Sequence, residues 1–210
     1  MSRPWYLRES SPGDGSADTG KARAPSGPGR TSHRLAPVPT SAEVLQRYRG
    51  TAVEDLLAYH NLGHPFRSHA QAEMLIAMCM DHRKMLRIPE NFAFILRTGG
   101  GNLRRIEFKL SYAIAIGGVR AVCLIAHNHC GMVELSRRRD DFVRGLVENG
   151  GWDRRDAEVH FDASAPEFEI GDPVSFVAQE AQRLSRRYPK VLFAPLHYDV
   201  GDGTLTQVVE

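Results

Sequence analysis

Two cysteines and one histidine stand where apolar, strand-like segments end. Cys79 closes the apolar run over residues 74–79, and His127 and Cys130 follow the apolar run over residues 121–126. Open α/β sheets place their ligands at the carboxyl ends of the strands, so we expect these three side chains to meet there. Two thiolates and one imidazole are the ligand set of a catalytic zinc site, which leaves a fourth position free. The sequence therefore predicts a Zn²⁺ site formed by Cys79, His127 and Cys130.

A carboxylate and a guanidinium follow the first cysteine closely, as Asp81 and Arg83. In an extended segment, residues two apart share a face, so both side chains are expected to point with Cys79 toward one pocket. An arginine beside an aspartate keeps the carboxylate ionised and oriented. Asp81 would then either accept a hydrogen bond from metal-bound water or bind the metal itself. The alternative is an exposed ion pair, which would contribute little.

Composition excludes several classes of protein. The chain has 210 residues, of which 42% are hydrophobic and 25% charged, as in an ordinary globular protein. Basic residues outnumber acidic ones only by 27 to 25, which gives no support to nucleic-acid binding. No apolar run approaches the ~20 residues of a membrane span, and no signal-peptide pattern is present. We therefore expect a cytoplasmic protein with reduced thiols, and the third cysteine, Cys123, is predicted to lie in the core.

Residues 1–40 differ from the rest of the chain. They contain six Pro, five Gly and six Ser with few apolar side chains, and they carry six basic against three acidic residues. Such a segment cannot bury enough surface to offset its ordering entropy, so it is predicted to be a disordered, basic tail. Its one cluster of aromatic and apolar residues, at residues 3–8, is either a solvated terminus, a docking motif for a partner or compartment shell, or part of a transit peptide.

Residues 41–210 are predicted to form one zinc domain of the α/β class. Apolar runs at 74–79, 92–96, 119–126, 191–194 and 204–209 read as strands, and helical spacing is found at 41–60, 104–116, 136–148 and from 173 to about 187. Thr40 and Glu43 have capping-box spacing, and Asp172-Pro173 is a strong helix start. The alternation of strands and helices predicts a mostly parallel central sheet flanked by helices.

The motifs together resemble the β-class carbonic anhydrases. The resemblance is carried by Cys79-x-Asp81-x-Arg83 and by His127-x-x-Cys130-Gly131, which begins 48 residues after Cys79. Residues 95–101 are similar to the family's Arg-Asn-Ala-Gly loop, and the likeness extends over roughly residues 41–210. Within the family, the motifs are most similar to those of the compact bacterial branch.

This resemblance implies reversible hydration of CO2 to bicarbonate by zinc-bound hydroxide. It assigns the metal to Cys79, His127 and Cys130, and it assigns catalytic roles to Asp81, which orients the nucleophile, and Arg83, which holds Asp81. His82 and His129 flank this site and titrate in a useful range, so each is either a proton relay or an ordinary loop histidine.

The resemblance also implies a homodimer, or a multiple of dimers, in which the helical segment 41–60 crosses to the partner. Tyr48 and Leu57 are then expected at the interface between subunits. Two other functions stay open: a related zinc hydrolase acting on carbonyl sulfide or carbon disulfide, and a weakly active or inactive zinc-binding assembly subunit. In the assembly subunit, the tail would dock a partner or a microcompartment shell, and the protein would work inside that compartment. Gly99-Gly100-Gly101 lacks the spacing of a nucleotide-binding loop.

Overall fold

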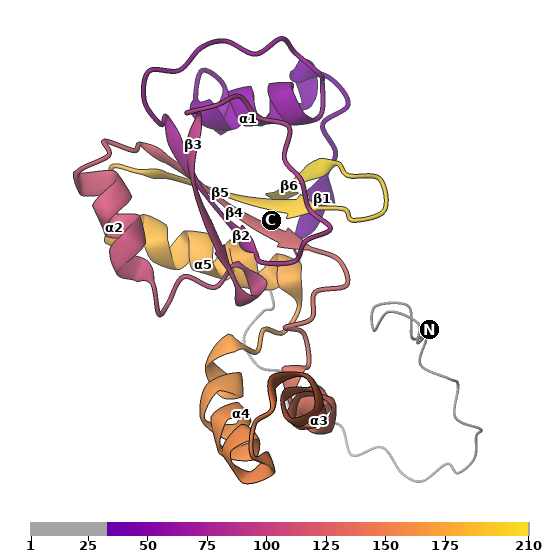
Figure 1. The fold of residues 1–210 in the computed structure, drawn as a ribbon. Coiled ribbons are helices and arrows are strands. Elements are labelled where there is room, and N and C mark those ends of the chain that lie inside the picture. The colour runs from indigo at the N-terminus through magenta and orange to yellow at the C-terminus, as the bar shows by residue number, and fades with distance from the viewer. Residues whose placement is uncertain (1–32, 210) are drawn as a thin grey trace, which may run out of the picture. The chain divides into compact units, whose positions relative to one another are not determined.

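A six-stranded sheet forms the centre of the protein in a computed structural model, which describes residues 33–209. The strands are β1 (Arg34–Ala36), β2 (Met74–Cys79), β3 (Ala93–Thr98), β4 (Ala121–His127), β5 (Leu192–Tyr198) and β6 (Leu205–Val209). They lie in the order β1-β6-β5-β4-β2-β3 (Figure 1). β3, β2, β4 and β5 pair in parallel, whereas β6 is antiparallel to both β5 and β1. The predicted fold class, a mostly parallel sheet flanked by helices, is confirmed.

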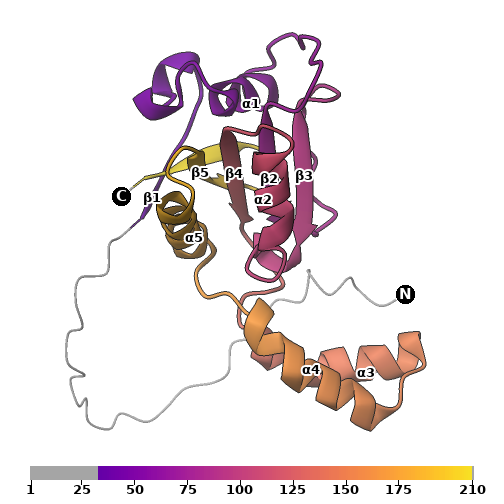
Figure 2. The same cartoon turned by 90° about the vertical axis from the view of Figure 1, so that its left-hand side faces the viewer.

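Helices cover both faces of this sheet (Figures 1 and 2). Those that do are α1 (Ala52–His60), α2 (Glu107–Ala115) and α5 (Pro173–Arg187), whereas α3 (Arg139–Gly150) and α4 (Arg154–Phe168) pack against each other. α1 and the 3-10 turn at Gln46–Tyr48 pack on one face, where their apolar side chains join those of β2, β4 and β5 in one buried cluster. α2 and α5 pack on the opposite face in a second cluster. The β-sheet is therefore the middle of three layers.

Two predicted helix starts are confirmed by their capping contacts. Thr40 and Glu43 form the predicted capping box, although the helix they start is a single 3-10 turn at Ser41–Glu43. The Asp172 carboxylate accepts a hydrogen bond from the Ser175 amide at 2.8 Å, and Pro173 occupies the first turn of α5. Both contacts satisfy amide groups that a helix start leaves without an intrahelical acceptor.

Two expectations for the segment 41–60 are wrong, whereas its crossing to a partner stays a prediction. It contains two 3-10 turns before α1 rather than one or two longer helices. Tyr48 and Leu57, which were expected at a subunit interface, are fully buried in the core of their own chain. The interface expectation for these two residues is wrong, because α1 lies flat on the sheet and uses its apolar face there.

The remaining differences concern elements with a weak apolar pattern. α4 was not predicted, and it packs beside α3 through Phe161 and Ala165 (Figure 2). β1, in the segment assigned to the tail, pairs with β6; the prediction of disorder for residues 1–32 lies outside the described residues. Within residues 33–209, no helix is long and apolar enough to cross a membrane.

Candidate metal centre

The three predicted ligands meet at one edge of the sheet. β2 and β4 are parallel neighbours with Met78 opposite Ile125, so Cys79 and His127 end adjacent strands at the same edge. Cys130 follows three residues after His127, in the turn that leaves β4. All three side chains are buried. The parallel register thus brings together residues that are 48 positions apart in the sequence.

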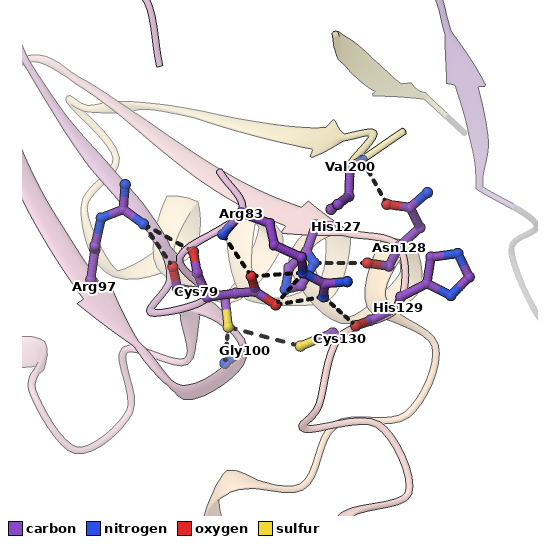
Figure 3. Close-up of polar contacts among 10 residues, drawn as sticks. Cys79, Arg83, Arg97, Gly100, His127, Asn128, His129, Cys130 and Val200 are labelled. Carbon is purple, nitrogen blue, oxygen red and sulfur yellow. Dashed lines mark hydrogen bonds and ion pairs between the residues drawn. The ribbon is translucent and has the colours of Figure 1, made fainter. Parts of the chain in front are cut away.

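The distances among the ligand atoms suit a single small cation. The two sulfur atoms of Cys79 and Cys130 lie 4.0 Å apart (Figure 3). A donor atom from each of Cys79, His127 and Cys130 lies within 4.8 Å of the other two. Zn–S bonds of about 2.3 Å and Zn–N bonds of about 2.0 Å can be accommodated in such a group.

His127 is oriented as a metal ligand. Its Nδ1 lies 2.8 Å from the Asn128 carbonyl oxygen, which can only accept, so Nδ1 carries the proton. The lone pair is then on Nε2, which is buried and has no hydrogen-bond partner. A ligating histidine ordinarily donates its other ring N–H in this way, and an unpartnered buried nitrogen is costly unless something binds it. The centre therefore fits Zn²⁺ by its donor set and by this orphaned atom.

The cysteines differ in their acidity according to their position. The hydrogen bond from Cys130 holds the pKa of the Cys79 thiol well below its usual value, and His127 acts in the same direction. The Gly100 amide also donates to the Cys79 sulfur, at 3.4 Å. Cys123, in the middle of β4, is fully buried, and burial raises the pKa of its thiol. The prediction that Cys123 is a core residue is confirmed.

The Asp81 carboxylate and the Arg83 guanidinium form a bidentate ion pair beside the sulfur atoms of the two cysteines. Arg83 donates from Nη2 to Oδ2 of Asp81 at 2.6 Å and from Nε to Oδ1 at 3.0 Å, and its backbone amide also donates to Oδ1 (Figure 3). These bonds hold the pKa of the Asp81 carboxyl well below its usual range. Only 7% of the Asp81 side chain and 15% of the Arg83 side chain are exposed, so this is not an ordinary surface pair. Asp81 is paired with Arg83 and is not a member of the ligand group.

Long-range hydrogen bonds fix the two segments that carry these residues. Arg97, on β3, donates to the carbonyl oxygens of Cys79, Asp81 and Lys84. Asn128 accepts a hydrogen bond from the Val200 amide at 2.8 Å and donates to Asp199. Arg83 joins the two segments by donating to the His129 carbonyl oxygen at 3.0 Å.

Apolar side chains line the remaining sides of the centre. Ile170 is buried against the two cysteines, with Met132, Val133 and Phe176 packed around them. Gly100 has a φ of 64° and lies so close to Ile170 that a Cβ would stand 3.1 Å from its Cδ1 atom. Glycine is needed there because of its positive φ and this close approach.

Solved structures have the same fold, whereas no family model matches the sequence and no curated protein does. A carbonic anhydrase from Glaciozyma antarctica is 25% identical over 66% of this chain and 84% of its own, with a TM-score of 0.51. A β-carbonic anhydrase of Trichomonas vaginalis is 16% identical over 78% and 97%, with a TM-score of 0.55. The carbonic anhydrase of Streptococcus mutans is 17% identical over 78% and 99%, with a TM-score of 0.50. The chain has the β-carbonic anhydrase fold.

Within the β-carbonic anhydrase fold, the predicted site residues lie together at one edge of the sheet. Cys79, His127 and Cys130 form the group that can hold a metal, and the Asp81–Arg83 pair lies beside it. The flanking histidines His82 and His129 are both exposed. The finer assignment to the compact bacterial branch stays a prediction.

Sequence reasoning assigned no role to three residues of this β-carbonic anhydrase-like centre, although Arg97 lies in the loop that supported the resemblance. Arg97 and Asn128 act through contacts with distant segments, and no local pattern announces such contacts. Lys84 is also buried, with 1% of its surface exposed, and its ammonium has no hydrogen-bond partner. A lysine directly after Asp81-x-Arg83 would ordinarily be interpreted as a solvated loop residue.

Proposed function

We propose that the protein catalyses the reversible hydration of CO2 to bicarbonate at a Zn²⁺ ion held by Cys79, His127 and Cys130. The observation that carries this proposal is the unpartnered Nε2 of His127, which lies with two cysteine sulfurs 4.0 Å apart at the edge of a β-carbonic anhydrase fold. When bound, Zn²⁺ lowers the pKa of a coordinated water to about 7 and so supplies a nucleophile at neutral pH.

The chain's own residues would orient and shelter the reaction. The Asp81 carboxylate is held ionised by Arg83, so it is an acceptor that can fix the direction of a water proton. Ile170 and its apolar neighbours give CO2, which is linear and apolar, a surface without competing polar groups. His82 and His129 are exposed, and we propose that one of them passes the released proton to solvent.

Metal analysis combined with stopped-flow CO2 hydration from pH 6 to 9 tests this function. We expect about one zinc per chain and a turnover that is lost when a chelator removes the metal and returns when zinc is added. Alanine variants of His82 and His129 test the proton relay, since loss of a relay should make turnover depend on buffer concentration. A fully zinc-loaded protein that does not accelerate hydration would refute the proposal.

A related hydrolysis is the main alternative for the same site. Carbonyl sulfide and carbon disulfide are also linear, apolar electrophiles, so an apolar pocket beside a metal suits them as well. CO2, carbonyl sulfide and carbon disulfide should therefore be assayed on one preparation. We expect the largest kcat/KM with CO2; a larger value with a sulfur compound would replace the proposed substrate.

We also propose a homodimer that uses the edge strand β3 and the outer side of α2. Four large apolar residues are exposed there, and this set is named the β3–α2 face: Phe94, Phe108, Tyr112 and Ile116. The two elements are adjacent, because a Cβ on Gly117 would stand 2.6 Å from the Phe94 ring. Among residues 33–209, β3 pairs only with β2, so one side of its backbone has no strand partner in that part of the chain. A second copy of the chain could cover both features, as expected from the resemblance.

Charge placed on this face tests the dimer. Ile116→Glu should shift sedimentation velocity from dimer to monomer, because a buried unpaired carboxylate is costly. Val159→Glu is the matched control, since Val159 is exposed on α4 away from this face. A wild-type chain that sediments as a monomer at every concentration would contradict the dimer.

The tail lies outside the described residues, and its proposed role rests on the sequence. Deleting residues 1–32 should leave CO2 hydration unchanged if the tail only docks a partner or shell. Loss of a co-purifying partner with normal hydration would support a docking tail on an active enzyme. Retained partner binding without the tail would contradict it.

A further inference from the structure

Lys84 is a buried cation that the proposed chemistry has not used. The residue is 1% exposed, and its Nζ has no hydrogen-bond partner among the described residues, although ammonium groups in proteins are almost always solvated or paired. Nothing else in the described chain combines such burial with a full charge beside the metal centre. The group is therefore expected to have a partner that binds from solution.

The surroundings of Lys84 place it at the metal pocket. Its ammonium interacts electrostatically with Cys79, Asp81 and Cys130, the sulfurs and the carboxylate of the centre. The backbone position is fixed from β3, because Arg97 donates to the Lys84 carbonyl oxygen at 3.0 Å. This contact fixes the backbone of Lys84, and the burial of its side chain keeps the charge among these groups.

Counting charges shows what kind of partner is missing. Two thiolates balance the charge of Zn²⁺, and His127 is neutral at the orientation its Nδ1 contact requires. Asp81 and Arg83 cancel each other in their ion pair. With a neutral water on the metal, Lys84 then leaves the loaded centre with one net positive charge. A small monovalent anion restores neutrality, and bicarbonate has that charge.

We propose that the Lys84 ammonium is the anion-binding group of the metal pocket and holds bicarbonate, or another small monovalent oxyanion, next to the metal. The inference rests on the proposed function only for the identity of the anion. Bicarbonate oxygens can accept a charge-assisted hydrogen bond from Nζ, which is stronger than a neutral one and stronger still in a buried site. Lys84 would therefore set the affinity for the product in hydration and for the substrate in the reverse reaction.

Anion binding to the cobalt-substituted protein tests the proposal without depending on turnover. Titration with bicarbonate, and separately with nitrate, is followed by the visible absorption of Co²⁺. Lys84→Met should raise the Kd for both anions about tenfold or more, as expected from losing a charge-assisted hydrogen bond. Lys84→Arg, which keeps the charge, should recover most of the affinity.

Lys190→Met is the matched control, because it removes the same charge from an exposed position after α5. Its Kd should equal that of the wild type. Metal content is measured for each variant. If Lys84→Met loses metal affinity while the loaded protein binds anions normally, Lys84 only balances the thiolates and the proposal is overturned. An unchanged Kd in Lys84→Met with normal metal content overturns it as well.

A second measurement uses the wild-type protein, so it does not depend on whether a variant folds. The sequence contains four lysines, Lys21, Lys84, Lys109 and Lys190, so side-chain nitrogen labelling gives a simple NMR spectrum. One Nζ signal, protected from solvent exchange, should move when bicarbonate is added; if none moves, the proposal fails. A protein that binds bicarbonate through Lys84 but does not hydrate CO2 would refute the proposed activity alone. A protein that hydrates CO2 without dependence on Lys84 would refute this inference alone.

Discussion

Residues 79–84, at and after the end of β2, and residues 128–130, after β4, each bring one cysteine to the metal centre, but they are built differently. Residues 80–84 carry a carboxylate, a guanidinium and an ammonium, and the Arg97 guanidinium clamps their backbone. Residues 128–130 carry no acidic group, and the neutral amide of Asn128 ties them to the turn between β5 and β6. The candidate metal ligands thus come from both segments, whereas the charged side chains beside them, Asp81, Arg83 and Lys84, all belong to one. Variants in the two segments should therefore fail in different ways.

The largest effect on zinc content and turnover is expected from the two cysteines, because each segment contributes one of them as a metal ligand. Cys79→Ser and Cys130→Ser each remove a thiolate from the centre, so zinc should be lost and CO2 hydration should fall to background. Metal analysis and stopped-flow hydration measure both effects. Cys123→Ala is the control, since Cys123 lies in the core of β4; it should keep its zinc while losing some stability. Zinc retained in either serine variant would show that the centre is not built from both segments.

The second-largest effect, a loss of turnover without loss of zinc, should appear only in variants of the segment that follows β2. Asp81→Asn and Arg83→Ala leave all three ligands in place, so we expect normal zinc content. Turnover should fall about 10²-fold, the usual contribution of a group that positions a proton. Stopped-flow hydration on variants with matched zinc content measures it. Normal turnover in both variants would remove the ion pair from the mechanism and make the two segments equivalent.

Smaller effects are expected from the residues that anchor each segment. Arg97→Met leaves the carbonyl oxygens of Cys79, Asp81 and Lys84 without this donor, and Asn128→Ala removes the link to Val200. Each change should cost about 1–3 kcal/mol of stability, measured by urea unfolding of the zinc-loaded protein. Arg97→Met should also lower turnover at normal zinc content, whereas Asn128→Ala should mainly speed zinc release to a chelator. Faster zinc release in Arg97→Met together with lower turnover in Asn128→Ala would contradict the division of roles between the two segments.

Whether a residue of this centre could be predicted depends on how far it lies in the sequence from the groups that it contacts. Cys79, His127 and Cys130 were predicted because residue type and strand-end position are local features of the sequence. Arg97 and Asn128 were missed because their partners lie 13–18 and 71–72 positions away in the sequence. The burial of Lys84 depends on the same tertiary contacts, so a local pattern gives no signal for it.

The helices show the same limit. The start of α5 was predicted from Asp172 and Pro173, because capping is local. α4 was missed, although Asp153 at its N-cap and buried residues at positions 157, 161 and 165 were signals that a search at helical spacing could have found. The apolar residues predicted that α1 and α2 are helices, but they did not predict which side chains are buried. Leu57 of α1 is in the core, whereas Phe108 of α2 is 79% exposed. Which apolar face meets the sheet is decided by topology rather than by the helix sequence.

The smallest effect expected is a difference in pH dependence between the two segments. Arg83 lowers the folded-state pKa of Asp81, so the ion pair adds stability above the unfolded pKa of about 3.9 and loses it as the pH falls through the folded value. Asn128 does not titrate. In urea unfolding of metal-free protein, Asp81→Asn should cost about 1 kcal/mol from pH 8 to 5, and this cost should shrink below about pH 4. The cost of Asn128→Ala should stay constant over the same range. A cost of Asp81→Asn that is equally constant down to pH 3 would mean that the carboxylate is not stabilised by Arg83, and the charged character of the β2 segment would then lose its main support.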